Sequence, residues 1–259
     1  MKPDRIILSC DSNPKFVEFW PLVAKGWRRF FDGVEVWLAL VAPEEFHVEQ
    51  FPGCFVERYE PVPGVPLQNQ AKVARYYLAA DWNDNSINST NDLDLLPLQS
   101  DYFLDLLSRR PPEHLLTIGQ ELYKGPEAGK FTAGYLTAES RIWRSLVDPK
   151  GLDWPAFVRS FIGKRVIDHK EDITRAIHHE NHDCFSDESL LRALLAETGV
   201  SVCHLPRGYS NYTDRALCRS QWMFDPEKLA DGVYVEAHLP RPWSEHRDRI
   251  QPLVDFLNK

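Results

Sequence analysis

The chain has 259 residues, of which 43% are hydrophobic and 26% charged, a composition typical of a globular protein. Its formal net charge of −8 argues against a nucleic-acid phosphate backbone or an anionic membrane surface as the main partner. A nucleotide remains compatible with this charge, because a local cation or a metal ion can neutralise a diphosphate. We expect one domain over residues 1–259.

Cysteine usage and the first residues bear on localisation. The five cysteines are irregularly spaced and form no C-x-x-C pattern, which predicts reduced thiols rather than a disulfide framework. The apolar run at residues 5–8 is too short for a signal peptide or a membrane span. We therefore expect a cytoplasmic protein without a transmembrane segment.

The first elements predict a β-α-β unit. Residues 5–9 form a short apolar run, typical of a buried strand. Asn13 suits a helix N-cap and Pro14 the first helical position, and apolar residues then recur at helical spacing as far as residue 31. Residues 34–41 follow as a second strand, which implies a parallel pair with a right-handed crossover. Residues 68–80 predict the next helix.

Residues 86–91 interrupt this regular pattern. They are polar, whereas a central strand that is buried on both faces is usually a run of Val, Ile or Leu. Either the strand before Asp92 is short, or Asp92 and Asp94 lie on a loose loop. The sequence leaves both explanations open.

The remainder of the chain continues to alternate between strands and helices. We expect strands at residues 115–123, 131–138, 200–205 and 233–235, and helices at residues 99–108, 139–147, 154–180, 187–198 and 246–258. Such alternation predicts an α/β fold with a mixed, mostly parallel sheet flanked by helices.

Asp92 and Asp94 are the first candidates for chemistry. On an extended segment, side chains at positions i and i+2 point to the same side of the backbone. Paired carboxylates suit Mg²⁺ or Mn²⁺, which prefer oxygen ligands and keep positions open for phosphate oxygens. Because Asp-x-Asp also occurs by chance on solvated loops, the motif gains weight only from its context.

That context resembles a GT-A glycosyltransferase in five segments that follow one another in the expected order. The segments are residues 6–11, 68–75, 91–98, 184–191 and 237–243. The resemblance implies a GT-A-like, Rossmann-like sheet, with the donor bound by residues 1–100 and the acceptor and a closing loop supplied by residues 101–259.

The resemblance also implies a set of site residues. Asp92, Asp94 and His238 would hold the metal, and an imidazole ligand favours Mn²⁺ over Mg²⁺. The donor would be bound by Cys10, Asp11, Gln70, Lys72, Arg75, Asp92 and Arg241. Lys72 and Arg75 lie three residues apart and so share one helix face, from which both could reach the same ligand. The alternative is that this face is simply exposed to solvent.

Asp187 and Glu188 follow Ser186 at the start of a predicted helix. Acidic residues there are often only helix stabilisers, because they complement the helix dipole. The functional interpretation makes Asp187, or else Glu188, the general base that deprotonates the acceptor hydroxyl in an inverting transfer. In a retaining enzyme, the same residue would hold hydroxyls of the donor sugar.

The sequence thus predicts a metal-dependent glycosyltransferase that moves a sugar from a nucleotide-sugar donor to a sugar or glycan acceptor. His178 and His182 have the spacing of zinc ligands on a helix, but no His-Glu-x-x-His motif is present. A metal-dependent nucleotidyltransferase is a second alternative, although residues 10–14 lack its glycine-rich loop. A non-catalytic binding protein on the same fold is the third.

Overall fold

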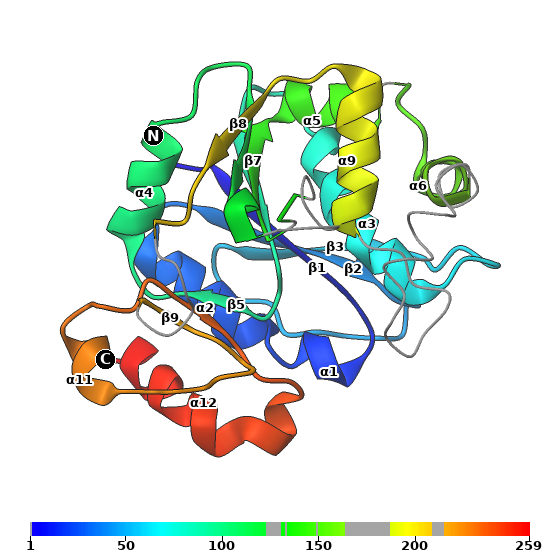
Figure 1. Cartoon of the computed structure of the whole chain (residues 1–259). Coiled ribbons are helices and arrows are strands. Elements are labelled where there is room, and N and C mark those ends of the chain that lie inside the picture. Colours follow the sequence, from blue (N-terminus) through cyan, green and yellow to red (C-terminus); the bar gives the residue numbers. More distant parts are fainter. Residues whose placement is uncertain (1, 123–130, 133, 149, 164–186, 209–214) are drawn as a thin grey trace.

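A mixed sheet forms the centre of the computed structural model, which describes residues 2–122, 131–132, 134–148, 150–163, 187–208 and 215–259. Within these residues, seven strands follow the order β3-β2-β1-β4-β7-β6-β8 (Figure 1). They are β1 (Arg5–Asp11), β2 (Glu35–Val41), β3 (Cys54–Tyr59), β4 (Ile87–Asn91), β6 (Leu115–Ile118), β7 (Tyr135–Glu139) and β8 (Val202–Leu205). Strands β3, β2, β1 and β4 run parallel, β7 is antiparallel to both of its neighbours, and β6 and β8 are parallel. The predicted fold class is confirmed.

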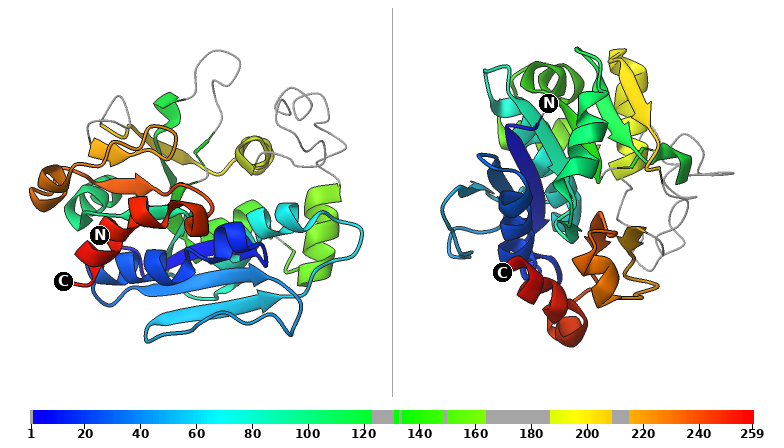
Figure 2. Two further views of the ribbon diagram at one scale, coloured as in Figure 1. Left: turned by 90° about the horizontal axis from the view of Figure 1, so that it is seen from below. Right: turned by 90° about the vertical axis from the view of Figure 1, so that its left-hand side faces the viewer.

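Two groups of helices cover the two faces of this sheet. Hydrophobic residues of α2 (Trp20–Phe30), α4 (Ser100–Ser108) and α12 (Trp243–Leu257) pack on one face. Those of α3 (Leu67–Asp81), α5 (Ser140–Val147), α6 (Trp154–Val158) and α9 (Asp187–Thr198) pack on the other. In β1, Ile6 and Leu8 belong to the first core and Ile7 to the second, as alternation along a strand requires. In Figures 1 and 2, α12 lies beside α2.

The first predicted helix is divided into α1 (Pro14–Val17) and α2. The Asn13 side chain caps α1 by accepting the backbone N–H of Lys15 at 3.0 Å, as predicted. Pro21 explains the division, because it has no amide hydrogen to donate to Val17 and its ring would clash with that carbonyl.

Strand β4 resolves the question of the polar segment, because it is a strand of ordinary length in the middle of the sheet. Asn88 and Thr90 are fully buried. Asn88 Nδ2 donates to Ala79 O and Ser140 Oγ, both at 2.9 Å, and Thr137 Oγ1 donates to Ser89 Oγ at 2.9 Å. Neither explanation offered by the sequence was right, since α3, α5 and β7 supply buried hydrogen-bond partners for Asn88 and Ser89 of this strand.

Several other boundaries differ from the sequence prediction. Strand β6 ends before Gly119, whose positive φ of 89° turns the chain into a 3₁₀ turn, η1 (Gln120–Leu122). Helix α6 continues as a π-helical turn, η3 (Arg159–Gly163), and the rest of the predicted 154–180 helix lies outside the described residues. Strand β3 and the short helix α11 (Pro226–Ala230) were not predicted.

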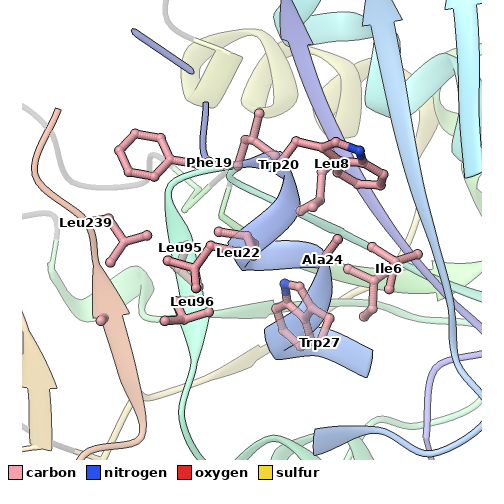
Figure 3. Close-up of a cluster of buried hydrophobic side chains, with 14 of the residues drawn as sticks. Ile6, Leu8, Phe19, Trp20, Leu22, Ala24, Trp27, Leu95, Leu96 and Leu239 are labelled. Carbon is pink, nitrogen blue, oxygen red and sulfur yellow. The ribbon is translucent and has the colours of Figure 1, made fainter. Parts of the chain in front are cut away.

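A small second sheet has the order β5-β10-β9, from β5 (Leu95–Pro97), β10 (Glu236–His238) and β9 (Ala216–Leu217). The strand predicted at residues 233–235 is wrong by three positions, because antiparallel pairing with the three residues of β5 determines where β10 lies. Figure 3 shows Leu95, Leu96 and Leu239 facing α2. A Cβ on Gly26 of α2 would clash with Leu96 Cδ1, so the close approach of β5 favours a glycine there.

None of the helices in the described ranges is both long enough and apolar enough to cross a membrane.

Candidate active site

A tight turn connects the large sheet to the small one. Asp92, Leu93 and Asp94 lie between β4 and β5, and the backbone N–H of Leu95 donates to Asp92 O at 3.1 Å. The expectation of an extended segment was therefore wrong. The two carboxylates converge because the chain turns, not because side chains alternate along a strand.

His238 completes a cluster with these two aspartates. One potential ligand atom from each of Asp92, Asp94 and His238 lies within 4.8 Å of the others. The small sheet brings the imidazole there, since β10 pairs His238 with Leu95 and the N–H of Leu239 donates to Asp94 O at 2.8 Å. Two carboxylates and an imidazole are a suitable donor set for a divalent transition metal, so these residues fit Mn²⁺.

Asp92 is held by Arg75 of α3. Arg75 Nη1 lies 2.6 Å from Asp92 Oδ1 and also donates to Asn91 O at 3.1 Å. The Arg75 side chain is only 4% exposed, so its position is set by the surrounding core. On the other side, a Cβ on Gly134 would lie 3.2 Å from Asp92 Oδ2. Arg75 therefore fixes one oxygen of Asp92, and the absence of a side chain at Gly134 leaves room beside the other.

Asp94 faces three potentially cationic side chains from the C-terminal part of the chain. Its Oδ2 lies 2.8 Å from Arg219 Nη1 and 3.2 Å from Arg241 Nε, and its Oδ1 lies 3.4 Å from His238 Nε2. Burial alone would raise the pKa of Asp94, but the charges of His238, Arg241 and Arg219 outweigh it and hold the pKa well below its usual range. Asp94 is thus ionised, and three side chains already lie against its carboxylate.

A buried acid, Glu236, lies on β10 two residues before His238. Its side chain is 1% exposed, Tyr135 Oη donates to its Oε2, and Arg207 Nη1 lies 3.5 Å from its Oε1. Burial, and to a lesser extent the charge of Asp92, raise the pKa of Glu236 to about 8. The sequence analysis did not identify Glu236, because a single glutamate at the start of a short strand carries no recognisable pattern.

Cys10 and Asp11 end β1, which runs parallel to β4 and next to it, so they lie at the same edge of the sheet as the acidic turn. Burial raises the pKa of the Cys10 thiol, which is therefore protonated at neutral pH. Asp11 Oδ1 accepts the backbone N–H of Asn13 at 3.0 Å. Contact of either residue with a nucleotide stays a prediction.

Gln70 and Lys72 lie on α3 with Arg75. The Gln70 amide accepts the N–H of Val62 at 2.8 Å and donates to Val62 O and Val65 O at 3.0 and 2.9 Å. The side chain of Gln70 therefore holds the loop before α3, and a direct donor contact stays a prediction for it. Lys72 is half-buried, and its role is likewise a prediction.

The candidate general bases, Asp187 and Glu188, are the first residues of α9, as predicted. Their side chains lie outside the described part of the structure, as do His178 and His182 of the alternative zinc site. The assignment of a base therefore stays a prediction.

The chain thus combines a mixed sheet, whose central strand β4 ends in an acidic turn, with a small sheet that brings a histidine to that turn. No family model and no curated protein matches the sequence.

Solved structures supply the comparison. The galactosyltransferase LgtC in complex with donor and acceptor sugar analogs has a TM-score of 0.55 and 16% identity, covering 98% of this chain and 95% of that one. An active-site mutant of LgtC has a TM-score of 0.53 and 16% identity, covering 97% and 95%. The glycosyltransferase GlyE of Streptococcus pneumoniae TIGR4 has a TM-score of 0.43 and 15% identity. That match covers 78% of this chain but only 45% of the GlyE chain. The similarity to LgtC confirms the fold.

Proposed function

We propose that this protein is a glycosyltransferase that moves a sugar from a nucleotide-diphosphate sugar to a hydroxyl of a sugar or glycan acceptor, with Mn²⁺ or Mg²⁺ as cofactor. The observation that carries the proposal is the cluster of Asp92, Asp94 and His238 within 4.8 Å. It lies at the edge of the sheet where the parallel strands β1 and β4 end, which is where α/β sheets bind ligands. The similarity to LgtC, which was solved with donor and acceptor sugar analogs, extends over nearly all of both chains and supports it.

Asp92, Asp94 and His238 would hold the divalent ion, and the imidazole favours Mn²⁺. The ion, when bound, neutralises negative charge on the departing nucleoside diphosphate. Arg241 lies 3.2 Å from Asp94, so its guanidinium can reach a phosphate of the same ligand. Arg75 keeps Asp92 oriented toward the ion and the donor ribose.

The other half of the site would bind the acceptor. In the proposed transfer, the acceptor oxygen attacks the anomeric carbon from the face opposite the diphosphate, and the bond from that carbon to the diphosphate oxygen breaks. Asp187, or else Glu188, takes the proton of the attacking hydroxyl. One displacement of this kind inverts the anomeric configuration, which NMR of the product tests directly. Retention would instead give the acidic residue a role in binding the donor sugar.

The test is hydrolysis of a panel of nucleotide sugars with and without Mn²⁺, compared between wild type and Asp94→Asn. We expect Mn²⁺-dependent hydrolysis of a matching donor, reduced at least about 100-fold in Asp94→Asn because the leaving diphosphate is no longer neutralised. Asp248→Asn is the matched control, since Asp248 is an exposed carboxylate on α12. Thermal unfolding of each variant checks that it folds.

Two results would contradict the proposal. Hydrolysis by Asp94→Asn at the wild-type rate would exclude this metal site. Release of pyrophosphate from a nucleoside triphosphate, without hydrolysis of any nucleotide sugar, would indicate a nucleotidyltransferase.

Thermal unfolding in the presence of nucleoside diphosphates gives an independent measurement, because a ligand at about 100 times its Kd stabilises the folded state by about 2.7 kcal/mol. For a transferase of this type we expect that stabilisation to require Mn²⁺.

A further inference from the structure

Arg219 is a close partner of Asp94 that the sequence analysis did not name. It follows β9, in a short turn closed by a bridge between Cys218 and Gln221. Its Nη1 lies 2.8 Å from Asp94 Oδ2, the same oxygen that lies 3.2 Å from Arg241 Nε. Two guanidinium groups therefore share one oxygen of a carboxylate that belongs to the candidate metal site.

The two arginines differ in how firmly they are held. The Arg241 guanidinium lies over the ring of Phe16, 4.9 Å from its centroid, and its side chain is 22% exposed. The Arg219 side chain is 37% exposed, on a turn at the edge of the small sheet. Arg219 is therefore the one that can leave Asp94 at lower cost and remain solvated.

The charges around the turn make such a movement useful. Asp92 and Asp94 supply two negative charges, while Arg75, Arg219 and Arg241 supply three positive ones. A divalent cation that enters this site alone must compete with Arg219 for Asp94 Oδ2 and is repelled by the guanidinium groups. A diphosphate removes both obstacles, since its oxygens are better partners for a guanidinium than a shared carboxylate oxygen.

We infer that Arg219 is a positioning residue that binds Asp94 while the site is empty and transfers to the diphosphate when the donor binds. This inference rests on the proposed function and deepens it. Arg219 makes metal binding depend on the nucleoside diphosphate, and because coupling is reciprocal, it makes diphosphate binding depend equally on the metal. The site is thereby protected from holding a metal ion without a donor.

The test is a titration of the full-length protein with Mn²⁺, followed by electron paramagnetic resonance of the free ion, with and without UDP, GDP, ADP or CDP. In Arg219→Gln, we expect Mn²⁺ alone to bind about fivefold more tightly, because a nearby positive charge and a competitor for Asp94 are removed. The ratio between the Mn²⁺ affinity with the matching diphosphate and the Mn²⁺ affinity without it should fall by a similar factor. A merely structural residue would instead weaken Mn²⁺ binding when replaced.

Arg215→Gln is the matched control. It removes the same charge from the same stretch of chain, but the Arg215 guanidinium lies over Tyr102, 5.8 Å from the ring centroid. We expect it to leave both affinities within about twofold of wild type. Arg219→Lys keeps the charge, and we expect its affinity for Mn²⁺ alone to stay close to that of the wild type. Thermal unfolding without ligand checks each variant for folding.

The outcomes separate this inference from the proposed function. Unchanged or weaker binding of Mn²⁺ alone to Arg219→Gln overturns the inference. If Asp94→Asn loses Mn²⁺ binding in the same experiment, the metal site stands and only the role of Arg219 is refuted. If Asp94→Asn binds Mn²⁺ like the wild type, the proposed function fails, and the inference fails with it.

Discussion

The two sheets each supply one carboxylate to the candidate metal site, and they hold it in different ways. Asp92 follows β4 of the large sheet and is paired with Arg75, 17 residues before it. Asp94 precedes β5 of the small sheet, and its partner Arg219 is 125 residues away. One side of the site is thus built within the N-terminal half, and the other is completed by the C-terminal part of the chain.

This difference separates a rigid side from an adaptable one. Arg75 is 4% exposed and is fixed by the core beneath α3, whereas Arg219 is 37% exposed on a turn. Elements that change with ligand binding are drawn from the less stable, more exposed parts of a fold. We therefore expect the Asp92 side to set the geometry of the site, and the Asp94 side to respond to the donor.

The largest effect is expected from Arg75→Met, which removes the rigid partner. Mn²⁺ affinity should fall about 10- to 100-fold, as is typical when the residue that orients a metal ligand is lost. The free energy of unfolding should fall by about 2 kcal/mol, less than for a fully buried pair because Asp92 is 37% exposed to solvent. Mn²⁺ titration and urea unfolding measure the two quantities.

Arg109→Gln controls for the loss of an arginine, since its ion pair with Asp105 is exposed on α4. It should change the free energy of unfolding by less than about 0.5 kcal/mol and leave Mn²⁺ binding unaltered. Wild-type Mn²⁺ affinity in Arg75→Met would mean that the large sheet does not orient Asp92, and the contrast between the two sides would be lost.

A smaller effect is expected from Gly26→Ala, which tests how the small sheet is seated. In an exposed helix this change would stabilise by up to about 1 kcal/mol. Here the new methyl would clash with Cδ1 of Leu96, a fully buried side chain. We expect the free energy of unfolding in urea to fall by about 1–3 kcal/mol, as for other overpacked cores. Because β5 begins directly after Asp94, a shift of β5 should also move Asp94 and weaken Mn²⁺ affinity.

A double-mutant cycle identifies the cause. Leu96→Ala removes the atom that the new methyl would meet, so adding Gly26→Ala to it should cost far less than in the wild type. An equal cost in both backgrounds would show that the loss arises from the helix itself and not from contact with β5.

Local patterns predicted the fold well where packing is local. The continuous apolar runs of β1 and β2 and the helical spacing in α2 predicted the β-α-β unit, because each pattern reflects burial of its own element. Strand β4 could not be predicted in this way. Its Asn88 and Ser89 side chains bond to Ser140 and Thr137, which lie about 50 residues further along the chain.

The site was predictable only as a set of residue types. Asp92, Asp94 and His238 were named from their order in the sequence, and the structure brings them together through the pairing of β10 with β5. The turn after Asp92 and the contact of the Arg219 guanidinium with Asp94 were not predictable from the sequence. Nothing near Arg219 forms a motif, because its importance comes from the way β9 lies beside β10.

The smallest effect is expected from Gly134→Ala, which touches the rigid side directly. Gly134 precedes β7, and a methyl there would lie 3.2 Å from Asp92 Oδ2, closer than most side-chain contacts. Arg75 holds Oδ1 at 2.6 Å, so the carboxylate can yield only by rotating about that contact. We expect Mn²⁺ affinity to fall about two- to fivefold, with less than about 0.5 kcal/mol change in the free energy of unfolding.

Gly134→Val should extend the trend, since its larger side chain forces a larger rotation. Unchanged Mn²⁺ affinity in both variants would mean that the orientation of Asp92 does not matter to the ion. Combining Gly134→Ala with Arg219→Gln then compares the two sides in one molecule. If the large sheet sets the geometry and the small sheet sets the dependence on diphosphate, the first change should weaken Mn²⁺ binding with and without diphosphate alike. Arg219→Gln should act mainly on the difference between the Mn²⁺ affinities measured with and without diphosphate. The effects of the two substitutions should add.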